Sequence, residues 1–222
     1  MFLNTPNSHI ILAIDTPDRT STLHVLDQCY DVVDAIKFNY PLILKEGLSL
    51  LTEVKRKYNL PIIADFKVAD VPVTNNRIAN LVKDAGADAI MVHGFIGSDS
   101  ILELKEVAGN EMGIIIVTEL TSPGGLEFTR QHATQFAELC NFLDCYGIQA
   151  PGTRPDQIKA LRGIVGSEKV IVSCGIGAQG GQLADAIDAG ATFGIIGRAI
   201  YEDKHPRAAA IRFQKEVSKH VH

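Results

Sequence analysis

The sequence lacks the features that mark several classes of protein. Its longest apolar run is a handful of residues, far short of the roughly 20 that a membrane-spanning helix needs. Residues 1–8 contain neither a basic segment nor an apolar core, so we expect no secretory signal. No polybasic run is present and the net charge is -5, so we expect neither nucleic acid nor a membrane as a partner.

Cysteine is scarce, and its spacing matches no familiar site. No Cys-x-x-Cys pair occurs, and the histidines do not complete a zinc pattern. We therefore expect reduced thiols in or near the core of a cytoplasmic protein, and no metal site. A structural disulfide is the alternative. The four cysteines are Cys29, Cys140, Cys145 and Cys174.

What the sequence does contain is a regular succession of short apolar runs. Its 222 residues fit one domain, expected to span 1–222, with an ordinary soluble balance of 46% hydrophobic and 21% charged residues. The runs are rich in Ile and Val, which is typical of strands buried on both faces. They lie at 9–14, 33–37, 61–64, 89–92, 114–117, 145–148, 170–172 and 193–196.

Segments with helical spacing separate these runs. One apolar stripe is predicted from Leu42 through Leu44 to Val54, and another from Ile78 through Leu81 to Ala85, closed by Gly86. A third helix is predicted to start at Pro155, and the last to open near 208–211. Eight strand–helix units predict a single (β/α)8 TIM barrel, with an open doubly wound sheet as the alternative.

Nearly every predicted strand ends in polar or glycine-rich residues. Barrel enzymes take their catalytic groups from the carboxyl ends of the strands and the loops that follow. We therefore expect a site on this rim. The eight strand ends are Asp15, Lys37, 65–67, 93–94, 118–124, 150–155, 174–181 and 197–198.

The third strand end carries closely spaced opposite charges. On an extended chain Asp65 and Lys67 point to the same side, and Phe66 points toward the helices. Asp70 follows in the loop, and Lys37 adds a second cation nearby. The pattern predicts an alternating Lys-Asp-Lys-Asp array in the barrel mouth. A structural ion-pair network is the alternative, because such networks also perturb pKa values.

The last two strand ends are typical of phosphate binding. Gly175-x-Gly177 is followed by a segment, 178–188, that we expect to be helical, and Gly197 is followed by Arg198. Barrels bind phosphate at these loops through backbone N–H groups and helix starts, and arginine adds a forked contact. The alternative is that the glycines serve only tight turns.

Three other rim residues are given structural interpretations in preference to catalytic ones. His93 has no evident carboxylate partner, so we expect a neutral histidine. Cys174 lacks an assigned base and is expected to be a small packed residue. Arg154 precedes a helix start and either serves structure or shapes the phosphate loop.

Residues 64–75, Ala-Asp-Phe-Lys-Val-Ala-Asp-Val-Pro-Val-Thr-Asn, closely resemble the signature of the orotidine 5'-phosphate decarboxylase family. The resemblance runs in order through all eight predicted strands and is strongest to the short, archaeal-type members. The other matching segments are 12–15, 36–41, 153–155, 175–181 and 196–201.

The resemblance implies a reaction and a role for each matching residue. It implies decarboxylation of orotidine 5'-monophosphate to UMP in pyrimidine biosynthesis, by a homodimer with no metal or organic cofactor. Asp15 and Lys37 bind the ribose, Asp65 lies beside the substrate carboxylate, and Lys67 delivers a proton to C6. Thr121 contacts the pyrimidine. Asp70, Val71 and Thr74 reach the partner's site, and the remaining substrate-binding residues are Gly175, Ile176, Gln179, Gly197, Arg198 and Tyr201, the last four at the phosphate.

The sequence departs from the family pattern at three positions. Thr121 stands where the family uses Ser, Ser122 where close relatives often carry His, and Cys174 where many carry Pro. Two other functions stay open: a Mg²⁺-dependent sister barrel acting on a keto-sugar phosphate, and a non-catalytic sensor of sugar phosphates or nucleotides. Gln179 and the continuation 71–75 favour the decarboxylase, and a sensor needs no proton donor.

Overall fold

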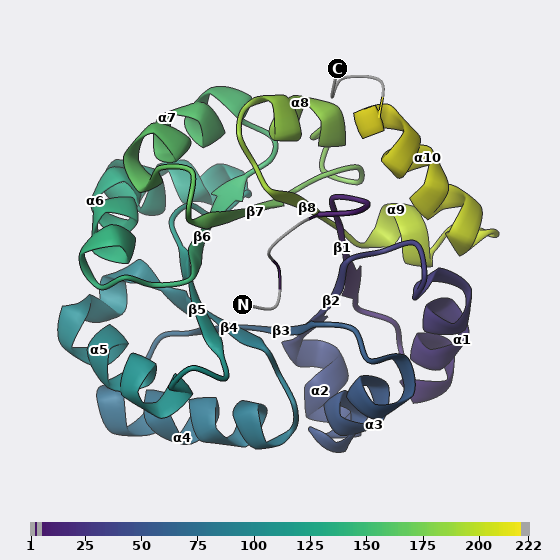
Figure 1. Ribbon diagram of the computed structural model, residues 1–222, viewed down its shortest axis with the longest axis horizontal. Coiled ribbons are helices and arrows are strands. Elements are labelled where there is room, and N and C mark those ends of the chain that lie inside the picture. Colours follow the sequence, from purple (N-terminus) through teal and green to yellow (C-terminus); the bar gives the residue numbers. More distant parts are fainter. Residues whose placement is uncertain (1–2, 4–5, 219–222) are drawn as a thin grey trace.

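Eight parallel strands close into a barrel in chain order, β1 to β8, and helices surround it (Figure 1). This computed structural model describes residue 3 and residues 6–218. The predicted (β/α)8 TIM barrel is confirmed. The strands are β1 Ile10–Ile14, β2 Ala35–Asn39, β3 Ile62–Val68, β4 Ala89–His93, β5 Gly113–Val117, β6 Gly147–Pro151, β7 Val170–Cys174 and β8 Phe193–Ile196.

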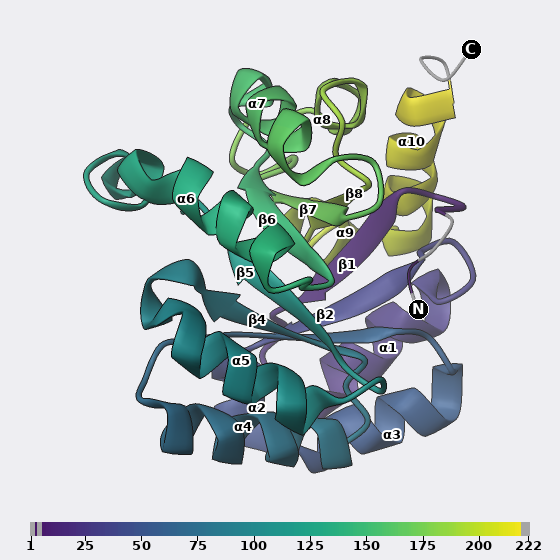
Figure 2. The same ribbon diagram turned by 60° about the vertical axis from the view of Figure 1, so that its left-hand side comes forward.

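The helices form a single layer outside the strands, with α4 and α5 packed side by side (Figure 2). No helix within the described residues is long and apolar enough to cross a membrane. The helices are α1 Arg19–Cys29, α2 Tyr40–Glu46, α3 Ser49–Tyr58, α4 Pro72–Asp84, α5 Gly97–Ala108, α6 Thr129–Phe142, α7 Pro155–Val165, α8 Leu183–Asp188, α9 Arg198–Tyr201 and α10 Pro206–Ser218, with short 3₁₀ turns η1 Gly94–Ile96 and η2 Pro123–Leu126.

The strands bury both of their faces. One apolar cluster fills the inside of the barrel and includes Ile11, Met91 and Phe193. The other, which includes Phe66, joins the outer strand faces to the helices. Because side chains alternate along a strand, every strand contributes to the outer cluster, and every strand except β6 contributes to the inner one. This explains why the strands are continuous apolar runs.

Two predicted strands begin later than expected. The runs at 33–37 and 145–148 correspond to β2 Ala35–Asn39 and β6 Gly147–Pro151. Val33 and Cys145 are buried, yet they lie before the first paired residue. An apolar run marks burial, whereas a strand begins where its backbone pairs with a neighbour, so the two starts need not coincide.

The long apolar stripe from Leu42 to Val54 is divided between two helices. Helix α2 ends at Glu46 and α3 starts at Ser49, with Gly47 at φ 78° between them. Leu44 is 83% exposed, and Leu81 on α4 is 57% exposed, so the prediction that both belong to buried stripes is wrong. The turn at Gly47 changes the direction of the chain, which spacing alone does not reveal.

The predicted helix over 178–188 is wrong in its first half, because α8 covers only Leu183–Asp188. The preceding loop has positive φ angles at Gly175, Gly177 and Gly180, and a bridge joins Ile176 to Gly181. Left-handed residues stop a right-handed helix from forming there. The other predicted boundary features hold: Gly86 follows α4 with φ 96°, and α7 starts at Pro155.

Candidate functional site

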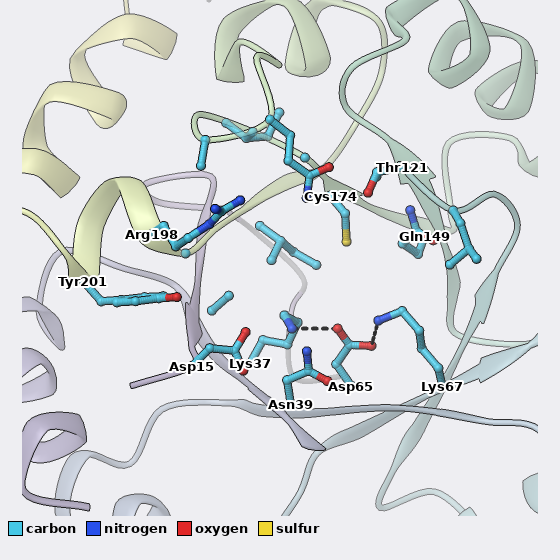
Figure 3. Close-up of a pocket in the computed structure, with 18 residues that line it drawn as sticks. Asp15, Lys37, Asn39, Asp65, Lys67, Thr121, Gln149, Cys174, Arg198 and Tyr201 are labelled. Carbon is cyan, nitrogen blue, oxygen red and sulfur yellow. Dashed lines mark hydrogen bonds and ion pairs between the residues drawn. The ribbon is translucent and has the colours of Figure 1, made fainter. Parts of the chain in front are cut away.

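A cavity of about 210 Å³ opens at the carboxyl ends of the strands (Figure 3). Side chains from many strand ends meet there, as a barrel site requires. Asp70, Val71 and Thr74 are not among its lining residues. The eleven other predicted site residues do line it: Asp15, Lys37, Asp65, Lys67, Thr121, Gly175, Ile176, Gln179, Gly197, Arg198 and Tyr201.

Asp65 lies between two lysines on the floor of this cavity. The Lys37 Nζ–Asp65 Oδ2 distance is 2.6 Å, and the Lys67 Nζ–Asp65 Oδ1 distance is 2.7 Å. The side chain of Asp65 is 2% exposed, that of Lys37 6% and that of Lys67 28%. The predicted charge array therefore exists in the fold, with Lys67 as its most accessible member.

The charges of the array stabilise one another against burial. Burial alone raises the pKa of the Asp65 carboxyl, but the positive charges of Lys37 and Lys67 outweigh it and lower that pKa below its ordinary value. Burial alone lowers the pKa of Lys37, but the Asp65 charge outweighs it and raises that pKa. Asp65 and Lys37 are therefore charged at neutral pH.

Strand β3 is irregular at the place where it supplies Lys67. The register with β4 shifts between Ala64 and Val68, and Lys67 has φ 41°. A non-glycine residue in this region costs about 1–3 kcal/mol, which the surroundings must offset. Phe66 packs outward and its ring stacks on Tyr40 at a centroid distance of 5.3 Å. Asp65 and Lys67 thus share a side as predicted, on a backbone that is not the regular strand we expected.

His93 and Cys174 lie near the array, and neither has the properties of a nucleophile or base. Burial, followed by the charge of Lys67, lowers the pKa of His93, whose ring stacks on Phe95. Cys174 lines the cavity, and burial, followed by the charge of Asp65, raises its pKa to about 11. A neutral histidine and a protonated thiol at pH 7 agree with the structural interpretations drawn from sequence.

The glycine loop after β7 forms the opposite part of the cavity wall. A Cβ atom at Gly175 would lie 3.2 Å from Thr153 Cγ2 and 3.4 Å from both Gln179 Oε1 and Thr121 Cγ2. With φ 89° as well, this position favours glycine on two grounds. Because Gly175 has no side chain, the loops after β5, β6 and β7 can approach one another here.

A buried ion pair joins the loops after β5 and β6. The carboxylate of Glu119 is 0% exposed, and Arg154 Nε lies 2.7 Å from its Oε1. Arg154 also donates to the carbonyl of Leu120 at 2.8 Å, and Arg130 lies 3.6 Å from the same carboxylate. Arg154 thus links two rim loops, and Glu119 is a partner that the sequence analysis did not identify.

Asp70 lies on an exposed turn that Asn75 holds in place. The Asn75 side chain accepts from the Asp70 backbone N–H at 3.0 Å and donates to the Asp70 carbonyl at 2.5 Å. It also donates to Ser100 Oγ at 2.7 Å, and it is 0% exposed. Val71 is 59% exposed beside it. The turn is therefore held by several hydrogen bonds, although Asp70, Val71 and Thr74 do not line the cavity of their own chain.

Several cavity residues were not identified from sequence. Asn39 and Gln149 could have been found by strand alternation, since Asn39 lies two residues beyond Lys37 and Gln149 lies two before Pro151 at the end of β6. The unassigned lining residues are Ala13, Asn39, Leu120, Gln149, Ala178 and Ile195.

No group of three or more His, Cys, Asp or Glu side chains within the described residues is placed to hold a metal ion.

Comparison with known proteins identifies one family. A family model described as "Orotidine 5'-phosphate decarboxylase / HUMPS family" matches residues 8–213. The orotidine 5'-phosphate decarboxylase of Pyrococcus furiosus is 42% identical over 210 residues, 95% of this chain and 98% of its own length. That of Methanococcoides burtonii is 44% identical over 213 residues, 95% of this chain and 98% of its own length.

Solved structures that superpose on this fold include enzymes with the same name as these sequence relatives. The orotidine 5'-monophosphate decarboxylase of Methanocaldococcus jannaschii, complexed with the inhibitor BMP, superposes with a TM-score of 0.89 at 37% identity, covering 94% of this chain and 97% of the other. The Pyrococcus horikoshii enzyme has a TM-score of 0.87 at 40% identity, covering 94% and 99%. With the family match over nearly its whole length, the chain belongs to the orotidine 5'-phosphate decarboxylase / HUMPS family.

Proposed function

We propose that the chain decarboxylates orotidine 5'-monophosphate to UMP and CO2, a step of pyrimidine biosynthesis, without metal or organic cofactor. The observation that carries the proposal is the Asp65 carboxylate held between the Lys37 and Lys67 ammonium groups, at 2.6 and 2.7 Å, on the floor of the cavity. The names of the relatives support the same reaction.

The substrate lies across the cavity in this proposal. Gln179, Gly197, Arg198 and Tyr201 hold the phosphate, with Gly175 and Ile176 beside them, and Arg198 supplies the forked, charge-assisted contact. Asp15 and Lys37 hold the ribose hydroxyls, and Thr121 contacts the pyrimidine. Support comes from the shared cavity wall, where the convergence at Gly175 brings the Thr121 and Gln179 loops together.

The chemistry is proton transfer in a charged, preorganised site. The bond from C6 to the carboxylate breaks, its electron pair stays on C6, and CO2 leaves. Lys67 stabilises this developing negative charge and then donates a proton to C6, which yields UMP. Lys67 regains its proton from solvent, so the reaction consumes one proton. Asp65 repels the substrate carboxylate and accepts a hydrogen bond from Lys67, which holds that side chain in place.

Electrostatics at one lysine cannot supply the whole barrier reduction, which reaches about 20 kcal/mol for slow uncatalysed reactions. The phosphate contacts therefore contribute as well, by ordering the loops around the reacting group. In this scheme Arg198 affects catalysis although it touches no reacting atom.

The active unit we propose is a homodimer in which Asp70, Val71 and Thr74 complete the partner's site. The support is that none of the three lines the cavity of its own chain. Val71 and Val73 are 59% and 58% exposed, an unusual position for apolar side chains that lie beside a charged turn. A subunit seated there would cover them.

The Mg²⁺-dependent sister reaction is the second candidate, and the Asp65 geometry argues against it. A divalent cation needs carboxylate oxygens that are free to coordinate it. Both oxygens of Asp65 instead accept from ammonium groups. A sensor that only binds its ligand would not need Lys67 as a proton donor.

One assay separates these functions. Purified protein is added to orotidine 5'-monophosphate, and the loss of its ultraviolet absorbance is followed with and without EDTA. We expect turnover that EDTA leaves unchanged. Turnover only of a keto-sugar phosphate, abolished by EDTA, would establish the sister reaction, and ligand binding without turnover of either substrate would establish the sensor.

A further inference from the structure

Gln149 is a buried amide that faces the cavity without a partner. Its side chain is 2% exposed and lines the cavity. Its backbone carbonyl accepts from Thr118 Oγ1 at 2.7 Å, but its carboxamide has no hydrogen-bond partner among the residues that the structure describes. An amide that lines a cavity and has no partner within the protein is available to donate to and accept from a ligand there.

Strand register points this amide into the barrel. Gln149 pairs with Val117 of β5 and Val172 of β7, both of which belong to the cluster inside the barrel. Paired residues of neighbouring strands face the same side of the sheet, so the Gln149 side chain faces inward as well. There it lines the same cavity as Lys67 and Asp65.

The position of Gln149 across the cavity indicates which end of the ligand it contacts. In Figure 3, Gln149 lies on the side that carries Lys67 and Thr121, away from Arg198 and Tyr201. This inference rests on the proposed function, in which the phosphate is at Arg198 and Lys67 reaches C6. The group attached to C6 is the carboxylate, an anion that accepts hydrogen bonds from an amide N–H.

We propose that the Gln149 carboxamide donates a hydrogen bond to the C6 carboxylate of the substrate. Asp65 repels this carboxylate, and a neutral donor from β6 holds the group in place until it leaves. When CO2 departs, the acceptor loses its charge and the hydrogen bond loses most of its strength. Gln149 therefore contributes to substrate binding and discriminates substrate from product, because UMP has no carboxylate.

Binding to an inactive background tests this discrimination. In a Lys67→Ala chain, the affinities for orotidine 5'-monophosphate and for UMP are measured by calorimetry, before and after adding Gln149→Met, which has a similar size and no donor. A hydrogen bond to a charged group corresponds to a roughly tenfold to hundredfold change in the dissociation constant. We expect that weakening for orotidine 5'-monophosphate and less than a threefold change for UMP.

The other outcomes overturn the proposal in distinguishable ways. Equal weakening for both ligands assigns Gln149 to the shared nucleotide or to packing, and no change for either removes it from the site. Failure of the Lys67→Ala parent to bind either ligand would refute the proposed function itself. In the otherwise unchanged enzyme, Gln149→Met raises KM more than it lowers kcat, because the lost contact is strongest before CO2 leaves. Gln149→Leu repeats the measurements if Gln149→Met does not fold.

Discussion

At the scale of single residues, the charge array is held in place by contacts among its own members. Asp65 keeps both oxygens within 2.7 Å of an ammonium group, and Lys67 adopts φ 41° to reach it. Groups that are already oriented need no reorganisation while charge develops on the substrate, which is the main advantage of a protein site over water. The irregular backbone at Lys67 is the local cost of that arrangement.

Lys67→Ala is expected to reduce kcat by at least a thousandfold and to leave a nucleotide ligand bound. The variant loses both the charge that stabilises C6 and the proton donor, whereas the phosphate and ribose contacts stay. Stopped assays with product detection measure the residual rate, and UMP calorimetry measures binding. Lys57→Ala, on an exposed pair with Asp27, is the matched control. Substantial residual turnover would exclude Lys67 as the proton donor.

The thiol of Cys174 is predicted to react with iodoacetamide in a pH-dependent manner that reflects its burial. Because its pKa is raised to about 11, the thiolate fraction grows about tenfold per pH unit from pH 7 to pH 10. An ordinary cysteine, with a pKa near 8.5, is half ionised at that pH and approaches its plateau above about pH 9.5. Mass spectrometry of the Cys174 peptide gives the rate, with free N-acetylcysteine as the reference and Cys174→Ser as the blank. A plateau above about pH 9.5 would contradict the prediction.

At the scale of elements, the rim loops are joined by groups that have no role in the proposed chemistry. The Glu119–Arg154 pair ties the loop after β5, which carries Thr121, to the loop after β6. Asn75 similarly ties the turn of Asp70 to α5 through Ser100. Loops that carry site residues are inherently mobile, so buried polar contacts of this kind are what hold them to the barrel.

Glu119→Gln is expected to destabilise the fold by about 3 kcal/mol, because it leaves the Arg154 guanidinium largely buried without its counter-charge. Urea unfolding followed by circular dichroism measures the change. Asp31→Asn is the matched control, since it breaks a pair whose side chains are 44% and 46% exposed, and its midpoint should hardly change. If the two variants had the same midpoint, the buried pair would not stabilise the rim.

At the scale of the whole molecule, the cavity of one chain contains eleven of the fourteen site residues expected from sequence. Outside it, Asp70 and Val71 lie on a turn that Asn75 holds by hydrogen bonds, and Thr74 follows in the first turn of α4. A symmetric dimer that places this turn over the partner's cavity would complete both sites at once, because each twofold contact occurs twice.

Mixing two inactive variants tests that assembly. Lys67→Ala and Asp70→Ala homodimers are combined at equal concentration and allowed to exchange subunits. Each mixed dimer then holds one intact site, so random exchange should restore about a quarter of the unmutated activity. Native mass spectrometry verifies the exchange. If mixed dimers form and no activity returns, Asp70 acts within its own subunit or not at all.

The barrel itself could be predicted from sequence because its determinants are local and repeated. Eight apolar runs, separated by segments of helical period, leave little choice of fold, and the polar strand ends mark the functional rim. The boundaries of β2 and β6, the break at Gly47 and the non-helical loop at 175–181 could not be predicted, since pairing and chain direction decide them.

For the site, the sequence by itself determined which charged and glycine residues occupy the strand ends, because the period of a strand places them on one side. Only the tertiary structure decided their geometry. The register shift in β3 lies where Lys67 meets Asp65, the barrel closure brings Gln149 to the same cavity, and contacts between loops pair Glu119 with Arg154. These contacts join residues from different strands and loops, and their distances depend on how the closed sheet twists and staggers, which no local pattern encodes.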